Sequence, residues 1–88
     1  MTVSTAIVTV IDVTGTTIGD FEFPLQMPVK NVANRFIEIL KAMDNEKYND
    51  VSDVYFKFKN SELKEQDTFW DKGIWDGSII ELNYSGRW

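Results

Sequence analysis

Residues 68–82, TFWDKGIWDGSIIEL, concentrate the side chains best suited to recognition chemistry. The segment contains Trp70 and Trp75, each followed directly by an aspartate. A tryptophan outside the core presents a large, rigid apolar surface and frequently anchors a protein interface. The same side chain can instead cover the rim of a small core. Both interpretations stay open, and Trp70 and Trp75 are our first candidates for partner binding.

Three aspartates, Asp67, Asp71 and Asp76, lie close together in the same part of the chain. Their spacing fits neither the EF-hand loop nor a cage of converging oxygen ligands. Asp67 instead suits the N-cap of a short helical turn over residues 68–71. Nothing in the sequence fixes two acids face to face, as paired catalytic carboxylates require. We therefore expect no metal site, no cofactor and no enzymatic activity.

The chain has 88 residues, with no cysteine and no histidine. These absences exclude thiolate chemistry, Ser-His and Cys-His nucleophiles and most transition-metal sites. The net charge of −5 repels phosphate backbones and anionic membrane surfaces, so we expect no nucleic-acid partner. No apolar run approaches the roughly 20 residues that span a bilayer, and the N-terminus lacks the basic region of a secretion signal. We expect one cytoplasmic domain over residues 1–88 that has protein partners, with its oligomeric state open.

Tyr55, Lys57 and Lys59 alternate along the segment DVYFKFKN and so share one face of a predicted strand. A basic and aromatic face of this kind can contact nucleic acid. The surrounding acidic residues and the net charge favour a solvated strand face instead. Tyr55 and Lys57 are further candidates for contacts with a protein partner.

Hydrophobic periodicity predicts the elements that position these residues. The β-branched segment AIVTVIDV predicts a strand over residues 6–13, with Val8 and Val10 facing the core. Alternation over residues 18–25 predicts a second strand, and Gly15 suits the hairpin turn between the two.

Apolar residues at spacings of three and four predict a helix over residues 28–43. Pro28 suits its first turn, where the missing N–H would have no partner in any case. The polar segment that follows, up to residue 53, is expected to be a loop. The expected buried face of the helix comprises Val29, Val32, Ala33, Phe36, Ile39, Leu40 and Met43.

The alternating segment 53–60 predicts a third strand, and residues 78–84 predict a last strand with Ile80 and Leu82 on one face. Between these strands, Gly73 is expected to close the short helical turn and Gly77 to turn the chain into the last strand. Ile74, between the two glycines, is expected to fill the core. One helix packed on a mixed sheet is an α+β arrangement of two layers.

This order of elements resembles the ubiquitin-like β-grasp fold. Residues 55–82 follow a ubiquitin-type pattern without a gap, and the helix matches at Val29, Val32 and Phe36. The hairpin needs about one extra residue in its turn. The recurrent core positions of that pattern correspond here to Phe56, Leu63, Phe69, Ile74, Ile80 and Leu82.

Within this fold, the helix start PVKNV, the short hairpin and the C-terminus resemble the YukD/EsaB family, small cytosolic proteins encoded with type VII secretion systems. The resemblance implies a noncatalytic interaction module that supports or regulates secretion. Conjugated modifiers end in Gly-Gly, whereas this chain ends Ser85-Gly86-Arg87-Trp88, so we expect no conjugation. Lys57 and Asn83 replace the apolar patch that ubiquitin receptors bind. A modifier or adaptor of another pathway is the alternative.

Trp75-Asp76-Gly77 also matches the Trp-X-Gly string of small secreted substrates of the same machinery. In those proteins the string occupies the turn of a helical hairpin. Here it precedes a predicted strand, and the chain has no pair of long amphipathic helices. We interpret the match as coincidental.

Overall fold

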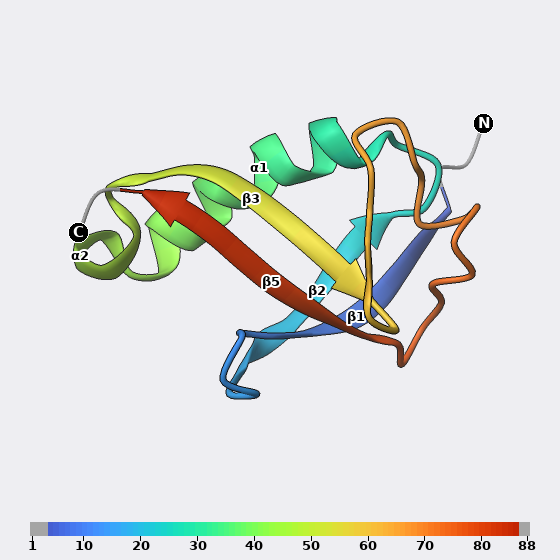
Figure 1. The fold of residues 1–88 in the computed structure, drawn as a ribbon, viewed down its shortest axis with the longest axis horizontal. Coiled ribbons are helices and arrows are strands. Elements are labelled where there is room, and N and C mark those ends of the chain that lie inside the picture. The colour runs from blue at the N-terminus through green and yellow to red at the C-terminus, as the bar shows by residue number, and fades with distance from the viewer. Residues whose placement is uncertain (1–3, 87–88) are drawn as a thin grey trace.

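A computed structural model describes residues 4–86, which form a five-stranded mixed sheet and two helices (Figure 1). The strand order in the sheet is β2-β1-β5-β3-β4, and the central pair β1 and β5 is parallel. The elements in chain order are β1 (Thr5–Ile11), β2 (Thr17–Pro24), α1 (Val29–Met43), α2 (Asn45–Tyr48), β3 (Val51–Phe58), β4 (Ser61–Glu62) and β5 (Ile79–Gly86).

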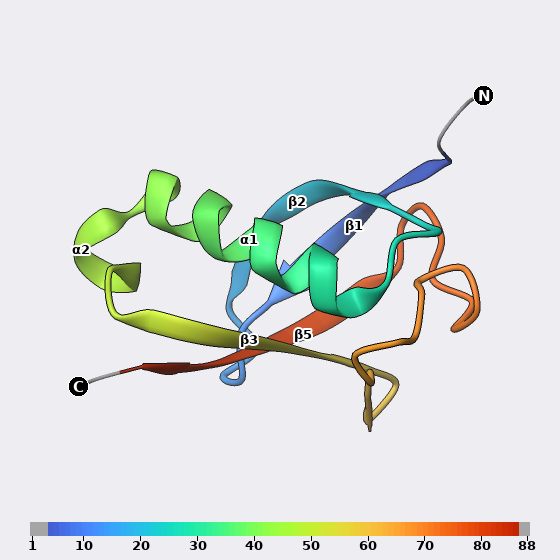
Figure 2. The ribbon, with the colours of Figure 1, turned by 90° about the horizontal axis from the view of Figure 1, so that it is seen from above.

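The sheet and α1 form two layers, with α1 crossing one face of the sheet (Figure 2). This arrangement confirms the expected α+β class. The expected hairpin of β1 and β2 is also present, and its two strands are antiparallel. The C-terminal residues Arg87 and Trp88 lie outside the described part of the chain.

The hairpin between β1 and β2 begins earlier than expected, because β1 ends at Ile11 rather than at residue 13. The Asp12 carboxylate accepts hydrogen bonds from the Thr14 N–H at 2.9 Å, the Thr16 N–H at 3.0 Å and the Thr14 hydroxyl at 2.6 Å. These bonds, the hydroxyl first, hold the pKa of Asp12 below its usual value. Gly15 has φ +88°, a conformation that residues with a Cβ rarely adopt. The Asp12 carboxylate therefore ends the strand, because its bonds to Thr14 and Thr16 stabilise a turn.

Helix α1 begins at Val29, and its first N–H groups bind a distant loop rather than a capping side chain. The Val29 N–H donates to the Asp67 carbonyl at 2.7 Å, and the Lys30 N–H donates to the Glu65 carbonyl at 3.0 Å. The first turn of a helix leaves such donors without partners inside the helix. The start of α1 is thus joined to the loop that precedes the two tryptophans.

The buried face of α1 is narrower than the sequence pattern indicates. Val29, Val32, Ala33, Phe36 and Leu40 are buried as expected. Ile39 and Met43 are exposed, and Ile37 packs against the core in their place. The sheet covers only one stripe of the helix, so apolar residues on its flank and at its last position remain in contact with solvent.

The expected loop after α1 contains a second helix. Asp44 caps α2 by accepting a hydrogen bond from the Lys47 N–H at 3.2 Å. The helix carries Tyr48 into the core, where its ring lies 5.6 Å from that of Tyr84. Strand β3 then starts at Val51, two residues before the expected position. A tyrosine in a polar segment offers no periodicity from which its burial can be predicted.

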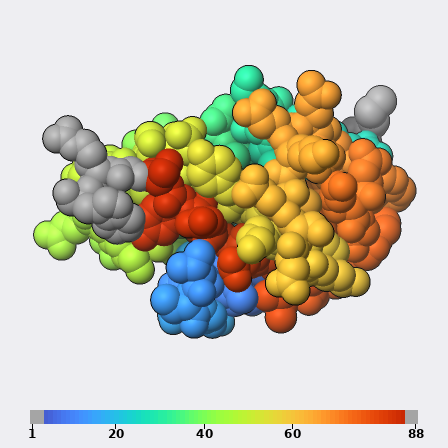
Figure 3. All heavy atoms as spheres, in the orientation of Figure 1, coloured from blue at the N-terminus to red at the C-terminus, as the bar shows by residue number. Residues whose placement is uncertain are grey.

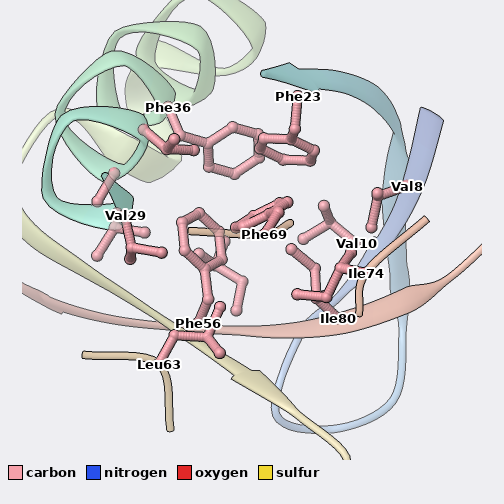
Figure 4. Close-up of a cluster of buried hydrophobic side chains, with 14 of the residues drawn as sticks. Val8, Val10, Phe23, Val29, Phe36, Phe56, Leu63, Phe69, Ile74 and Ile80 are labelled. Atoms are coloured by element: carbon pink, nitrogen blue, oxygen red, sulfur yellow. The ribbon is translucent and has the colours of Figure 1, made fainter. Parts of the chain in front are cut away.

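The core contains every position that the ubiquitin-type pattern predicts. Rings of Phe23, Phe36, Phe56 and Phe69 meet at the centre, with neighbouring centroids 5.1–6.0 Å apart (Figure 4). Val8 and Val10 are buried on β1, and Ile80 and Leu82 are buried on β5, so the predicted faces of both strands are confirmed. Leu63 and Ile74 are also buried.

Replacing Phe69 by alanine should lower the free energy of unfolding by about 3–5 kcal/mol, because the side chain is fully buried and its neighbours cannot fill the cavity. Ile39→Ala is the matched control on the exposed flank of α1 and should cost about 1 kcal/mol or less. Urea denaturation measures both values. Equal losses in the two variants would contradict the placement of these side chains.

Candidate protein-interaction surface

The loop between β4 and β5 forms a hydrogen-bonded turn just before the first tryptophan. Asp67 does not cap the following turn as expected. Its carboxylate accepts a hydrogen bond from the Lys64 N–H at 2.8 Å and so closes the preceding turn. The Thr68 hydroxyl takes the capping role, accepting from the Asp71 N–H at 3.0 Å. Asp67 and Thr68 are adjacent and both can cap a helical turn, so the sequence alone does not show which of them does so.

A single helical turn follows and ends in a Schellman motif. The Gly73 N–H donates to the Trp70 carbonyl at 3.2 Å, and the Ile74 N–H donates to the Phe69 carbonyl at 3.0 Å. Gly73 has φ +72°, which confirms its expected left-handed conformation. Because Phe69 and Ile74 are both buried, the motif directs the intervening residues away from the core.

A second turn attaches the loop to β1. The Gly77 N–H donates to the Ile7 carbonyl at 2.9 Å, and the Ile7 N–H donates to the Asp76 carboxylate at 2.7 Å. Within the turn, the Trp75 N–H donates to the Ser78 hydroxyl at 2.9 Å. Gly77 has φ +86°, as its predicted role at the start of the last strand requires. Both ends of the loop are therefore held by hydrogen bonds to other elements.

These attachments bring Trp70 and Trp75 together. Their ring centroids are 5.0 Å apart, and the ring planes meet at 72° in an edge-to-face arrangement. Trp70 is 47% exposed and Trp75 is 48% exposed, so each ring is in contact with solvent as well as with the other ring. We call residues 67–78 the tryptophan end; they lie in the orange segment at one end of the molecule (Figure 3).

The other two candidate residues lie on a different surface. Tyr55 and Lys57 are exposed on the outer side of β3, opposite Asn83 and Glu81 of β5. Among residues 4–86, no aromatic-ring contact and no cation–π contact joins Tyr55 or Lys57 to either tryptophan. The structure therefore separates the four sequence candidates into the tryptophan end and the outer face of the sheet.

Two exposed isoleucines were missing from the sequence candidates. Ile7 is 49% exposed on β1, and Ile79 is 57% exposed on β5. Their position follows from strand parity, because Val8 and Ile80 face the core and neighbouring residues face the opposite side. The Ile7 N–H donates to the Asp76 carboxylate and the Ile7 carbonyl accepts from the Gly77 N–H, so this part of β1 lies beside the tryptophan end. Only the tertiary fold reveals that proximity.

Helices in the described residues are all too short or too polar to cross a membrane.

Comparison with known proteins gives matches to solved structures alone. No protein-family description and no curated protein sequence matches the chain. The EccD5 ubiquitin-like domain from Mycobacterium xenopi superposes with a TM-score of 0.71 at 10% identity, over 97% of this chain and 99% of that one. The ubiquitin-like domain of the Mycobacterium tuberculosis type VII secretion protein EccD1 gives 0.71 at 21% identity, over 90% and 97%.

A chain of the ESX-5 inner membrane complex also matches, with a TM-score of 0.70 at 11% identity. The match covers 96% of the present chain and 22% of that much longer one. At such low identities the likeness establishes the fold alone. The described residues, matched almost end to end by ubiquitin-like domains, have the ubiquitin-like β-grasp fold.

Replacing Gly73 by alanine should lower the free energy of unfolding by about 1–2 kcal/mol, since a left-handed backbone disfavours a Cβ. Space is not the cause, because no atom lies within 4 Å of the added Cβ. Gly73→Asn should lower the free energy of unfolding by less, because asparagine tolerates this conformation. Thermal unfolding of both variants measures the difference. An alanine variant as stable as the asparagine variant would contradict the motif.

Proposed function

We propose that the protein is a noncatalytic ubiquitin-like interaction module that supports or regulates a type VII secretion system. The observation that carries this proposal is the match, over at least 90% of this chain, to ubiquitin-like domains of two mycobacterial type VII proteins. We expect a chain of this size and fold to act by binding other proteins. The EccD names apply to those proteins alone.

Within this function, we propose a cytoplasmic protein of the YukD/EsaB type that is not conjugated to targets. The support is the sequence resemblance at PVKNV and in the hairpin, together with the sheet surface. Exposed Lys57 and Asn83 occupy the outer face that in ubiquitin is apolar. The absence of cysteine and histidine from the sequence supports a binding role rather than catalysis.

We assign the principal contact surface to Trp70 and Trp75. Two tryptophans, each about half exposed, give a protein interface a large apolar area. Their backbone is already held by hydrogen bonds, so little conformational freedom is lost when a partner binds. Tyr55 and Lys57 form a second surface that is solvated and more polar, and it serves as the internal comparison.

The test is direct binding of the full chain to the soluble domains of the secretion-system proteins encoded in the same genome, measured by biolayer interferometry. We expect saturable binding to at least one of them. The Trp70→Ala, Trp75→Ala double variant should raise the Kd about tenfold or more, as truncated hot spots do. Tyr55→Ala and Lys57→Ala should change the Kd by about twofold or less. Circular dichroism confirms that each variant is folded.

Failure of the folded protein to bind any of these domains would refute the secretion role. Equal losses of affinity in the tryptophan variant and in the sheet-face variants would refute the assigned contact surface but not the secretion role.

The alternative function is a ubiquitin-like modifier or an adaptor domain of another pathway. One observation favours keeping it: the N-terminal ubiquitin-like domain of the 4931431F19Rik protein also matches, with a TM-score of 0.67 at 17% identity. A modifier forms covalent adducts that survive denaturing electrophoresis. Tagged protein incubated with a lysate of the cells it comes from should give a single band. A ladder of ATP-dependent adducts would contradict our proposal and support the modifier function.

A further inference from the structure

The tryptophan end combines exposed aromatic rings with negative charge. Asp71 directly follows Trp70, and Asp76 directly follows Trp75. Lys72 lies between them, but its ammonium group forms an ion pair with Asp67 at 3.6 Å. Within residues 4–86 this is the only ion pair, so no internal ion pair neutralises Asp71 or Asp76.

The arrangement of the two rings suits a cation. The face of an indole ring carries negative quadrupole potential and attracts an ammonium or guanidinium group within about 6 Å of the ring centre. The planes of Trp70 and Trp75 meet at 72°, so they form a corner rather than a flat stack. A cation seated at this corner would contact both rings, and an aspartate follows each tryptophan directly in the chain.

The chemistry of a guanidinium group suits this surface. A guanidinium group is planar and can stack on an aromatic ring while its N–H groups donate to carboxylates. The Asp76 carboxylate already accepts from the Ile7 N–H through Oδ1, which holds this carboxylate beside β1 and leaves its charge in place. A quaternary ammonium lipid headgroup also stacks on tryptophan, but it has no N–H group that could donate a hydrogen bond to the aspartates.

We propose that the tryptophan end binds an arginine side chain within a segment of a partner protein, with the guanidinium on Trp70 and Trp75 and its charge balanced by Asp71 and Asp76. The net charge of −5 agrees with a basic partner segment and opposes an anionic one. This inference rests on the proposed function as a binding module, although it does not depend on which secretion protein is the partner. It specifies the chemistry that such a partner must present.

The test uses NMR titration of the isotope-labelled full chain with three short peptides. The peptides share the sequence Gly-Ser-Leu-X-Leu-Ser-Gly, where X is arginine, its neutral isostere citrulline, or glutamate. We expect the arginine peptide to shift the indole N–H signals of Trp70 and Trp75 saturably. The citrulline peptide should bind about tenfold more weakly, and the glutamate peptide should leave both signals unshifted. Raising the salt concentration should weaken the arginine peptide selectively.

Single variants separate the two parts of the proposed contact. Asp71→Asn and Asp76→Asn should each weaken the arginine peptide about threefold to fivefold by removing charge. Asparagine at position 76 keeps an oxygen that can accept the Ile7 N–H, so the fold is preserved. Trp75→Phe keeps an aromatic ring and should retain part of the binding, whereas Trp75→Ala should abolish it. Ile39→Ala, on the exposed flank of α1, should leave the arginine affinity unchanged.

Equal affinity for the arginine and citrulline peptides, or the absence of saturable shifts with either, would overturn the inference. So would shifts confined to the outer sheet face. Phosphatidylcholine vesicles provide the lipid comparison, and saturable vesicle binding without preference for the arginine peptide would assign the site to a lipid headgroup instead. If secretion-system domains still bind through the tryptophans when arginine preference is absent, this inference fails and the proposed function stands.

Discussion

Burial of Phe69 determines where the tryptophans lie. Its ring packs 5.1 Å from that of Phe23 on β2 and 5.9 Å from that of Phe56 on β3, so one loop residue joins both halves of the sheet. Phe69 points inward and the Schellman motif returns Ile74 to the core, so Trp70 between them faces solvent, and Trp75 directly after Ile74 is exposed as well. The exposed aromatic surface is therefore a consequence of core packing in the same segment.

Hydrogen bonds from other elements complete this constraint. The Trp70 N–H donates to the Leu25 carbonyl at 2.9 Å, and the start of α1 donates to carbonyls of Glu65 and Asp67. Bonds to Ile7 hold the far end of the loop against β1. A loop without regular secondary structure thus has the fixed geometry that a binding surface needs. The same bonds place the surface next to the parallel pair at the centre of the sheet.

Much of the fold followed from the sequence because the elements have strong periodicity. Val8, Val10, Phe36, Ile80 and Leu82 are buried as predicted, and the fold comparisons confirm the ubiquitin-like arrangement. The errors have local causes. Asp12 ended β1 early through turn hydrogen bonds, and Tyr48 entered the core from a segment whose polarity indicated a loop. Propensity describes a residue and its neighbours in the chain, whereas both of these outcomes depend on bonds and contacts that the pattern does not record.

The sequence by itself determined the alternation of the strands, the amphipathic face of α1 and the glycines at the two positive-φ positions of the tryptophan end. It also supplied two tryptophans, each followed by an aspartate, as the candidates for recognition. Only the tertiary structure decided that Trp70 and Trp75 touch, that Tyr55 and Lys57 belong to another surface, and that β1 carries Ile7 beside the tryptophan end. The physical reason is that periodicity specifies which side of an element is apolar, while the distance between side chains on different elements depends on how those elements pack.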